Sequence, residues 1–462
     1  MKKLFVLFVL LFVSSVNLPA QTYGDAALAQ VSLKDKSSRD AQGKLQTLTA
    51  PEHLYRADVY MSNRQFPQAR EHWQRFMETY PTNAGMAKAL MGTGRSFMWE
   101  RDYARAIIYF DRAVKDYSNT KEGRESLAFK GACLVRLGKN AEAAQTYQLY
   151  TTMFPTGEKI ETSYLNIIDA LREAKKYDEA NLWVDKTTQR FAGMPTATNA
   201  LQARARMEIN RGNWQKAIAA TQVLITLNDF SDSMSSLDEA VYLKALALEK
   251  AGQKDLAIDA YSSIMDTPAS YYGGLATEKL RQFGITNLAA KRAAAIRLSS
   301  ASAYPVLYRA ELLKYSKSNN IDPRFLLAIM KQESSFRANA KSPAAARGLL
   351  QLVYDTALKY NQKAGFPQMQ ADDLYQPSVN IAIGSTYVAE LKDEFGGLYE
   401  AIAASYNGGE DNAARWLKRS NPKDAGIFAA EVGFAETKAY VFKVMNNYRV
   451  YRELYTEDLV KK

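Results

Sequence analysis

Glu333 stands where the surrounding sequence predicts a buried apolar side chain. Asp322 is a typical helix N-cap and Pro323 fits a first helical turn, so we expect a helix over 323–333. The residues that recur on one face of this helix, at spacings of three and four, are Leu326, Ile329, Met330 and Glu333. Reduced hydration and the negative end of the helix dipole both favour a protonated carboxyl here, as a general acid needs near neutral pH. The alternative is a solvated glutamate at a frayed helix end.

Histidine and cysteine content limits the chemistry that can accompany Glu333. The two histidines, His53 and His72, lie far from the carboxy-terminal half, and Cys133 is the only cysteine. A Ser-His or Cys-His nucleophile pair is therefore excluded in that half, as is a zinc site built from His and Cys. An intramolecular disulfide is impossible. We expect no metal and no cofactor, and chemistry carried by carboxylates, hydroxyls and amides.

The stretch from Gln332 to Leu352 resembles the first motif of the soluble lytic murein transglycosylase family, whose members cleave bacterial peptidoglycan. That motif runs from an acid followed by Ser, through a Ser-containing turn, to Gly-Leu-Met-Gln. The matching steps are Glu333-Ser334, Ser342 and Gly348-Leu349-Leu350-Gln351. Ala345 stands where the family usually has Gly, and Leu350 where it has Met. We expect this stretch to begin on one helix, pass through a tight polar turn and end on the next helix.

Two further motifs of the same family follow in order. The second is Ala-Tyr-Asn-Ala-Gly before a helix with a Trp, and its counterpart is Ala404-Ser405-Tyr406-Asn407-Gly408-Gly409, before Trp416. The third pairs a Glu with Glu-Thr, then Tyr-Val and Asn-Tyr, and its counterparts are Glu431, Glu436-Thr437, Tyr440-Val441 and Asn447-Tyr448. Gly408 replaces Ala, and Val432-Gly433 replaces the usual Ile-Pro. Three motifs in this order specify the family better than any single short run does.

The resemblance implies cleavage of the β-1,4 bond between N-acetylmuramic acid and N-acetylglucosamine in peptidoglycan glycan strands. Glu333 would protonate the bridging oxygen. As the resulting carboxylate it would take the proton of the sugar's own 6-hydroxyl, which closes a 1,6-anhydro ring. By motif position, the expected substrate-binding residues are Ser342, Gln351, Tyr406, Asn407 and Glu431.

Each of these residues also has a structural interpretation. Ser342 and Gln351 would hydrogen-bond the sugar or its acetamido group, or else form a Ser-Pro turn and an exposed helix position. Tyr406 would lie beside the developing positive charge, although Tyr406-Asn407 followed by glycines is also an ordinary helix end. Glu431 stands in an uncharged, aromatic stretch of sequence and would hold Tyr406 or a sugar, or else occupy the surface.

Two other functions are compatible with the same residues. A goose-type lysozyme uses the same fold but lets water attack, so its product has a free reducing end. A cell-wall-binding scaffold would bind glycan without cutting it. The intact Glu333 argues against a scaffold, whereas the departures at Ala345, Leu350 and Gly433 keep it open.

Residues 51–285 contain a repeat that predicts stacked helical pairs. The copies FPQA, YARA, NAEA, YDEA and WQKA end at Ala69, Ala106, Ala143, Ala180 and Ala217, each 37 residues after the one before, and a weaker copy ends at Ala257. They resemble tetratricopeptide repeats, so we expect an α-solenoid that binds a protein partner or glycan, or that serves as a spacer. The alanines are assigned to packing. Tyr271-Tyr272-Gly273-Gly274-Leu275-Ala276, with a short helix after it, is expected to close the solenoid.

The expected fold is all-α, with the solenoid followed by a lysozyme-like, mainly helical catalytic domain over 304–462. The segment 21–50 precedes the solenoid, and 286–303, rich in Ala and Ser, is expected to be a linker. Within the catalytic domain, the expected helix starts lie near Asp355, at Pro377, at Leu398 and near Glu436.

Residues 1–20 have the features of a secretory signal peptide. Lys2 and Lys3 precede an apolar run, Leu4–Val13, that is too short to span a bilayer, and cleavage could follow Ala20. No cysteine stands directly after this cleavage site, so we expect an exported, soluble protein of the periplasm or cell envelope, with no lipid anchor and no membrane span. The net charge of +11 suits an anionic partner such as a cell-wall polymer, or solubility alone. We expect no nucleic-acid partner.

Overall fold

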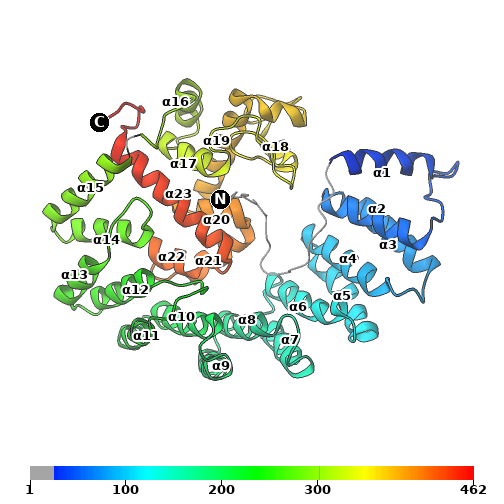
Figure 1. Ribbon diagram of the computed structural model, residues 1–462, viewed down its shortest axis with the longest axis horizontal. Helices are drawn as coiled ribbons and strands as arrows, with labels where there is room; N and C mark the ends of the chain where they lie inside the picture. The colour runs from blue at the N-terminus through cyan, green and yellow to red at the C-terminus, as the bar shows by residue number, and fades with distance from the viewer. Residues whose placement is uncertain (1–24, 301) are drawn as a thin grey trace, which may run out of the picture. The chain divides into compact units, whose positions relative to one another are not determined.

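The computed structural model describes residues 25–300 and 302–462, and the predicted signal segment 1–20 lies outside them. Within these ranges the chain forms 23 α-helices and one 3-10 helix, and its β-type pairing is limited to isolated bridges (Figure 1). The prediction of an all-α fold is confirmed. None of the helices in these ranges is long and apolar enough to cross a membrane. The chain divides into two compact units, one that ends at Ala192 and one that runs from Gly193 to Lys462.

The first unit consists of packed helical pairs. Its helices are α1 (Asp25–Ser37), α2 (Ala50–Ser62), α3 (Phe66–Thr79), α4 (Met86–Trp99), α5 (Tyr103–Tyr117), α6 (Lys121–Arg136), α7 (Asn140–Met153), α8 (Ile160–Glu173) and α9 (Tyr177–Arg190). The repeat alanines of this unit are fully buried, as predicted: Ala69, Ala106, Ala143 and Ala180. Glycine allows close packing between helices, because a Cβ on Gly94 or Gly131 would lie 2.6 Å from a ring carbon of Phe110 or Tyr147.

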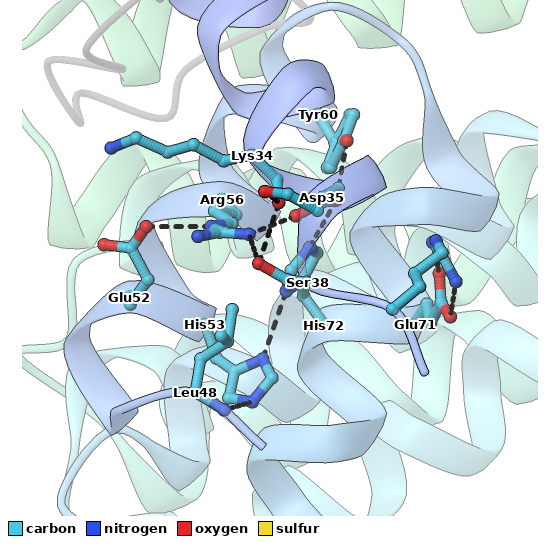
Figure 2. Close-up of polar contacts among 12 residues, drawn as sticks. Lys34, Asp35, Ser38, Leu48, Glu52, His53, Arg56, Tyr60, Glu71 and His72 are labelled. Carbon is cyan, nitrogen blue, oxygen red and sulfur yellow. Dashed lines mark hydrogen bonds and ion pairs between the residues drawn. The ribbon is translucent and has the colours of Figure 1, made fainter. Parts of the chain in front are cut away.

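A buried polar cluster attaches α1 to α2 and α3 (Figure 2). Asp35 of α1 accepts hydrogen bonds from the hydroxyl of Tyr60 at 2.7 Å and from His72 Nε2 at 2.9 Å. Its other oxygen forms an ion pair with Arg56 at 2.5 Å. Burial opposes ionisation of Asp35, but the hydrogen bonds from His72, Tyr60 and Arg56 outweigh it and hold the pKa of this carboxyl at about 2. Asp35 is therefore a charged anchor inside the unit.

The two histidines extend this cluster as a chain of hydrogen bonds (Figure 2). The backbone N–H of Leu48 donates to His53 Nε2, so the proton of a neutral His53 ring is on Nδ1. That Nδ1 lies 3.1 Å from Nδ1 of His72, which can accept the bond while its Nε2–H donates to Asp35. Two neutral rings thus satisfy every bond in the chain. Burial lowers the pKa of His53 to about 4, which keeps that ring neutral at pH 7.

We expect Asp35→Asn to lower the free energy of unfolding of this unit by about 3 kcal/mol at pH 7, because buried Arg56 loses its buried anionic partner and keeps only Glu52, whose side chain is 33% exposed. Acid should weaken the same cluster in the parent protein. The stabilising contribution of neutral His53 is complete above pH 6.5 and is lost towards pH 4, and that of Asp35 is complete above pH 3.8 and is lost towards pH 2. Thermal denaturation from pH 7 to pH 2 measures both contributions, with Asp116→Asn, whose side chain is 43% exposed, as the control. An Asp35→Asn protein as stable as the parent at pH 7 would contradict this prediction.

The second unit begins with the last helices of the repeat region. They are α10 (Pro195–Asn210), α11 (Trp214–Leu227), α12 (Leu237–Lys250), α13 (Lys254–Ser263), α14 (Tyr271–Gln282) and α15 (Thr286–Ser300). The repeat alanines Ala217 and Ala257 are again fully buried. Most of the expected linker at 286–303 is helical, because α15 occupies Thr286–Ser300. Alanine, the commonest residue there, is the strongest helix former.

The remaining helices of this unit follow along the chain. They are α16 (Arg309–Ser318), α17 (Pro323–Glu333), α18 (Tyr354–Tyr360), the 3-10 helix η1 (Ala371–Tyr375), α19 (Pro377–Glu394), α20 (Tyr399–Gly408), α21 (Glu410–Arg419), α22 (Ala425–Glu431) and α23 (Ala435–Leu454). Among them, α17 packs mainly against α23 and α16. Every residue of α17 from Pro323 to Met330 is buried. The four helix starts predicted in this region are observed to within one residue.

Candidate active site

Glu333 is the last residue of α17, which has the predicted limits. Asp322 caps the helix, since its carboxylate accepts a hydrogen bond from the backbone N–H of Arg324 at 2.9 Å. The hydroxyl of Tyr448 donates to the same carboxylate, also at 2.9 Å. The predicted apolar face is fully buried, with Leu326, Ile329 and Met330 at 0% exposure. A rigid, capped helix therefore carries one carboxyl at the end of its buried face.

Two tyrosines lie beside the Glu333 carboxyl. The hydroxyl of Tyr440, on α23, donates to Oε1 of Glu333 at 2.6 Å. Burial, and after it the charge of Glu333, raises the pKa of Tyr406 well above its usual range, so this phenol stays neutral. Burial also raises the pKa of Glu333 to about 7, although the hydrogen bond from Tyr440 acts in the opposite direction. A carboxyl with this pKa exchanges its proton readily near neutral pH, as a group that acts as acid and then as base must do.

The segment from Ser334 to Val353 is an irregular loop rather than the expected passage from helix to helix. The Ser334 hydroxyl donates to the Leu349 carbonyl at 2.8 Å, and isolated bridges pair Arg347 with Lys341 and with Leu352. Helix α18 begins only at Tyr354. The prediction that the motif ends on a helix is therefore wrong, since side chains and bridges close the loop on itself.

The loop places Ser342 and Gln351 in turns. Ser342 Oγ accepts a hydrogen bond from the backbone N–H of Ala346 at 3.1 Å, which agrees with the turn interpretation of this residue. The Gln351 side-chain amide donates to the carbonyls of Ala340 at 3.0 Å and Gly348 at 2.8 Å. Gln351 has a φ of +47° and does not lie on a helix. Both side chains thus help to shape the loop that follows Glu333.

Asn380, on α19, holds this loop through hydrogen bonds to its backbone. The motifs do not predict this residue. Its Oδ1 accepts from the backbone N–H of Leu350 at 2.8 Å, and its Nδ2 donates to the carbonyls of Arg347 at 3.0 Å and Leu374 at 2.8 Å. Asn380 is fully buried. A polar residue inside the apolar run of α19 is the sequence signal that could have identified it, because a buried amide is retained only where its hydrogen bonds are satisfied.

Tyr406 and Asn407 come from the last turn of α20. The hydroxyl of Tyr406 donates to the carbonyl of Leu350 at 2.6 Å, so the second motif holds the first. Asn407 Oδ1 accepts from the hydroxyl of Thr437 at 2.7 Å, which links the second motif to the third. Tyr440 lies in the third motif, but the motif spacing does not reveal its contact with Glu333. The structure therefore brings Glu333, Tyr406 and Tyr440 together around one loop.

Glu431 does not share this environment. It is fully buried, and its Oε2 lies 3.0 Å from a guanidinium nitrogen of Arg206 and 3.2 Å from Nε of Arg419. Although its sequence neighbours are uncharged, two arginines that are distant in the sequence fold against this carboxylate, and Glu431 does not occupy the surface. A fully buried side chain has no surface with which to contact a sugar. In residues 25–300 and 302–462, no three His, Cys, Asp or Glu side chains are grouped so that they could hold a metal ion.

Comparison with known protein families agrees with the motifs. Residues 312–428 match the family model of the transglycosylase SLT domain. This part of the chain is an SLT domain. Residues 54–121, 101–158 and 239–270 match tetratricopeptide repeat models. The sequence-based assignment of tetratricopeptide-like repeats followed by an SLT domain is therefore confirmed.

The SLT domain is similar to parts of longer curated proteins. The soluble lytic murein transglycosylase of Salmonella typhimurium is 30% identical over 151 residues, which cover 32% of this chain and 23% of that protein. The membrane-bound lytic murein transglycosylase C of Sodalis glossinidius is 30% identical over 166 residues, which cover 31% of this chain and 46% of that protein. The chain thus spans less than half of the length of these relatives. The 70 kDa soluble lytic transglycosylase of Escherichia coli has a TM-score of 0.49 and 16% identity, over 96% of this chain and 90% of that chain.

Proposed function

We propose that this chain is a lytic transglycosylase that cleaves the β-1,4 bond between N-acetylmuramic acid and N-acetylglucosamine in peptidoglycan. The observation that carries the proposal is the Glu333 carboxyl, which has a pKa of about 7 and a hydrogen bond from Tyr440. The names of the relatives of the SLT domain, which are lytic murein transglycosylases, support the choice of substrate. We assign the chemistry to residues 304–462.

In the proposed reaction, Glu333 carries out both proton transfers. Protonated Glu333 donates its proton to the bridging oxygen as the bond from that oxygen to C1 of N-acetylmuramic acid breaks. The departing N-acetylglucosamine is left with a 4-hydroxyl. The Glu333 carboxylate then takes the proton of the muramic acid 6-hydroxyl, whose oxygen bonds to C1 and closes the 1,6-anhydro ring. No water is consumed and Glu333 ends protonated, so one carboxyl suffices where hydrolytic glycosidases commonly use two. The attacking hydroxyl belongs to the same sugar, which removes much of the entropic cost of bringing a second reactant into place.

The polar groups around Glu333 are proposed to hold the sugars. Burial keeps Tyr406 neutral, and its electron-rich ring can face the positive charge that develops at C1. Both amide protons of Gln351 are used within the loop, so its carbonyl oxygen is the group that would accept a bond from a sugar hydroxyl or acetamido N–H. Ser342 and Asn407 are proposed to contribute a hydroxyl and an amide beside them. Glu431 is not proposed to touch the sugar.

Mass spectrometry of purified peptidoglycan digested with the full chain tests the proposal. The expected products are muropeptides with 1,6-anhydromuramic acid ends, lighter by one water than the corresponding hydrolysed forms. Products with free reducing ends would contradict the proposal and would show that the chain acts as a lysozyme, in which water attacks. Binding to peptidoglycan without any product would replace it with a scaffold.

We also propose that residues 1–20 direct export to the periplasm or cell envelope, where the substrate lies, and that the tetratricopeptide repeats contact a protein partner or glycan there. The tetratricopeptide repeat matches support an interaction role for this region. Fractionation of cells that produce the full chain, with detection of the processed amino terminus by mass spectrometry, tests the first statement. An unprocessed chain confined to the cytoplasm would refute it.

A further inference from the structure

Helix α23, which carries Tyr440, lies between α17 and α20 on one side and α14 and α15 on the other (Figure 1). Lys438 and Phe442 are one helical turn apart and share a face of α23, whereas Tyr440 between them is rotated by roughly 200°. The side that points away from Glu333 is therefore the side that carries Lys438 and Phe442. Neither residue takes part in the proposed reaction, so the contacts that Lys438 and Phe442 make must have another role.

Lys438 forms a buried ion pair with a helix of the repeat region. Its Nζ lies 2.6 Å from Oε2 of Glu239 on α12, and the two residues are 3% and 1% exposed. The other carboxylate oxygen of Glu239 accepts a hydrogen bond from the side-chain amide of Gln202 on α10. Burial lowers the pKa of Lys438, and the charge of Glu239 opposes this effect. A buried ammonium is costly unless its partner stays in place, so this pair penalises any displacement of α23.

Phe442 is held by the Tyr271-Tyr272-Gly273-Gly274 motif of α14. Its ring stacks on Tyr271, with centroids 4.7 Å apart and planes at 16°, and meets Tyr272 edge-on at 5.6 Å. A Cβ on Gly274 would lie 2.6 Å from the guanidinium of Arg449, another residue of α23. The two tyrosines and the glycine thus pack closely against the face of α23 that carries Lys438 and Phe442.

The helix before α23 is attached to the same part of the chain. The hydroxyls of Tyr271 and Tyr272 donate to the carbonyls of Ala425 at 3.2 Å and Gly426 at 3.3 Å, both on α22. At the end of α22, Glu431 pairs with Arg206 of α10. Contacts from α10 and α14 therefore hold the segment that leads into α23, as well as the face of α23 that carries Lys438 and Phe442.

We propose that Lys438 is a positioning residue for the active site. Its ion pair with Glu239, together with the packing of Tyr271 and Tyr272 around Phe442, sets the rotation of α23. This rotation places the Tyr440 hydroxyl within hydrogen-bond distance of Glu333. The last helices of the repeat region thereby regulate the proton affinity of the acid. This inference rests on the proposed function only where activity is the readout. The titratable groups beside the Glu333 carboxyl are Tyr440 from α23 and Tyr406 from α20.

The test compares Lys438→Met with Tyr440→Phe in the full chain. Loss of the Tyr440 hydrogen bond should raise the pKa of Glu333 by about one unit, because that bond favours the carboxylate. The alkaline limb of the rate profile, where protonated Glu333 is lost, then moves to higher pH. Lys438→Met should shift the limb in the same direction and lower kcat by about tenfold, with KM unchanged, since a small misplacement of a catalytic contact has effects of this order. Lys438→Arg keeps the positive charge, so its alkaline limb should lie at the same pH as that of the parent.

Two additional variants separate positioning from general damage. Glu239→Gln should reproduce the shift, and Glu239→Gln/Lys438→Met should shift the limb no further than either single change, because both remove the same pair. Lys443→Met, at an exposed position on α23, should behave like the parent. If Lys438→Met does not fold, Glu239→Gln, which keeps the shape of the side chain, decides the question.

The pKa of Glu333 can also be measured without any reaction. Selective ¹³C labelling of glutamate carboxyls gives a titration curve for Glu333, assigned by the signal that disappears in Glu333→Gln. A raised pKa in Lys438→Met and in Glu239→Gln supports the inference, and a folded variant pair that titrates like the parent overturns it. If the parent chain cleaves no glycan, the proposed function fails while these titrations still decide the role of Lys438.

Discussion

A Glu333→Gln protein should fold like the parent and lose glycan cleavage by on the order of 10⁴-fold, because in the proposed reaction this one side chain supplies both proton transfers. Glutamine keeps the size of the side chain and can accept the hydrogen bond that Tyr440 donates. It can neither protonate the bridging oxygen nor take the proton of the 6-hydroxyl. Release of soluble 1,6-anhydro muropeptides from purified peptidoglycan, quantified by mass spectrometry, measures the loss.

The same substitution should change how stability depends on pH. Burial raises the pKa of Glu333 from 4.5 to about 7, so the stabilising contribution of its protonated form is complete below pH 4.5 and is lost as the pH rises through 7. Glutamine does not ionise. At pH 8 the variant should therefore be more stable than the parent by about 2 kcal/mol, a value reduced for partial exposure of the side chain, and the difference should vanish near pH 4.

Glu390→Gln provides the matched control, since it makes the same chemical change at a side chain that is 54% exposed on α19. Neither cleavage nor the pH dependence of stability should change in this control. A Glu333→Gln protein that retains a tenth of the parent's cleavage would show that another group supplies the proton. Equal stability of variant and parent at pH 8 would show that the carboxyl is well hydrated in the folded chain.

The helix that carries Glu333 could be predicted because its determinants are local. An N-cap at Asp322, a first-turn proline and an apolar spacing all act within the 11 residues of α17 or next to it. The loop after it could not be predicted in the same way. Leu350 is held by Asn380, 30 positions away, and by Tyr406, 56 positions away. Local propensity carries no information about such contacts.

The environment of Glu431 could not be predicted for the same reason. Its sequence neighbours are uncharged, but its partner Arg206 lies 225 positions away and reaches it only in the folded chain. The sequence also does not reveal the contact between Tyr440 and Glu333. A tyrosine in an aromatic helix fits a packing role, and only the position of α23 beside α17 shows that its hydroxyl meets a carboxyl. Motif spacing therefore points to Glu333 as the candidate acid, whereas the contact that Tyr440 makes with it can be seen only in the fold.

The second large effect is expected at Gly348, where Gly348→Ala should lower the free energy of unfolding by roughly 3–5 kcal/mol. Gly348 has a φ of +78°, in the left-handed region that alanine adopts at a cost. An added Cβ would also lie 2.1 Å from the Leu374 carbonyl oxygen and 2.3 Å from Nδ2 of Asn380. Either the backbone of the loop or Asn380 must move. Thermal and denaturant unfolding measure the loss of stability.

Gly365→Ala isolates the backbone contribution to this effect. Gly365 has a φ of +90°, and nothing lies within 4 Å of the Cβ that alanine would add there. Its substitution should therefore cost only about 1–2 kcal/mol and leave glycan cleavage unchanged. The difference between the two variants is the energy of the contact with Leu374 and Asn380. Equal destabilisation by both would mean that the loop absorbs the Cβ without strain.

The functional consequence of Gly348→Ala follows from the hydrogen bonds of its neighbours. Asn380 holds the N–H of Leu350, and the Leu350 carbonyl accepts the bond from Tyr406, so a shift of the loop is transmitted to the tyrosine beside Glu333. We expect cleavage by the folded fraction of this variant to fall by about 10²-fold, as for other small displacements of catalytic geometry. Gln351, whose amide donates to the Gly348 carbonyl, moves with it. Full cleavage activity in the folded fraction would show that the loop does not set the position of Tyr406.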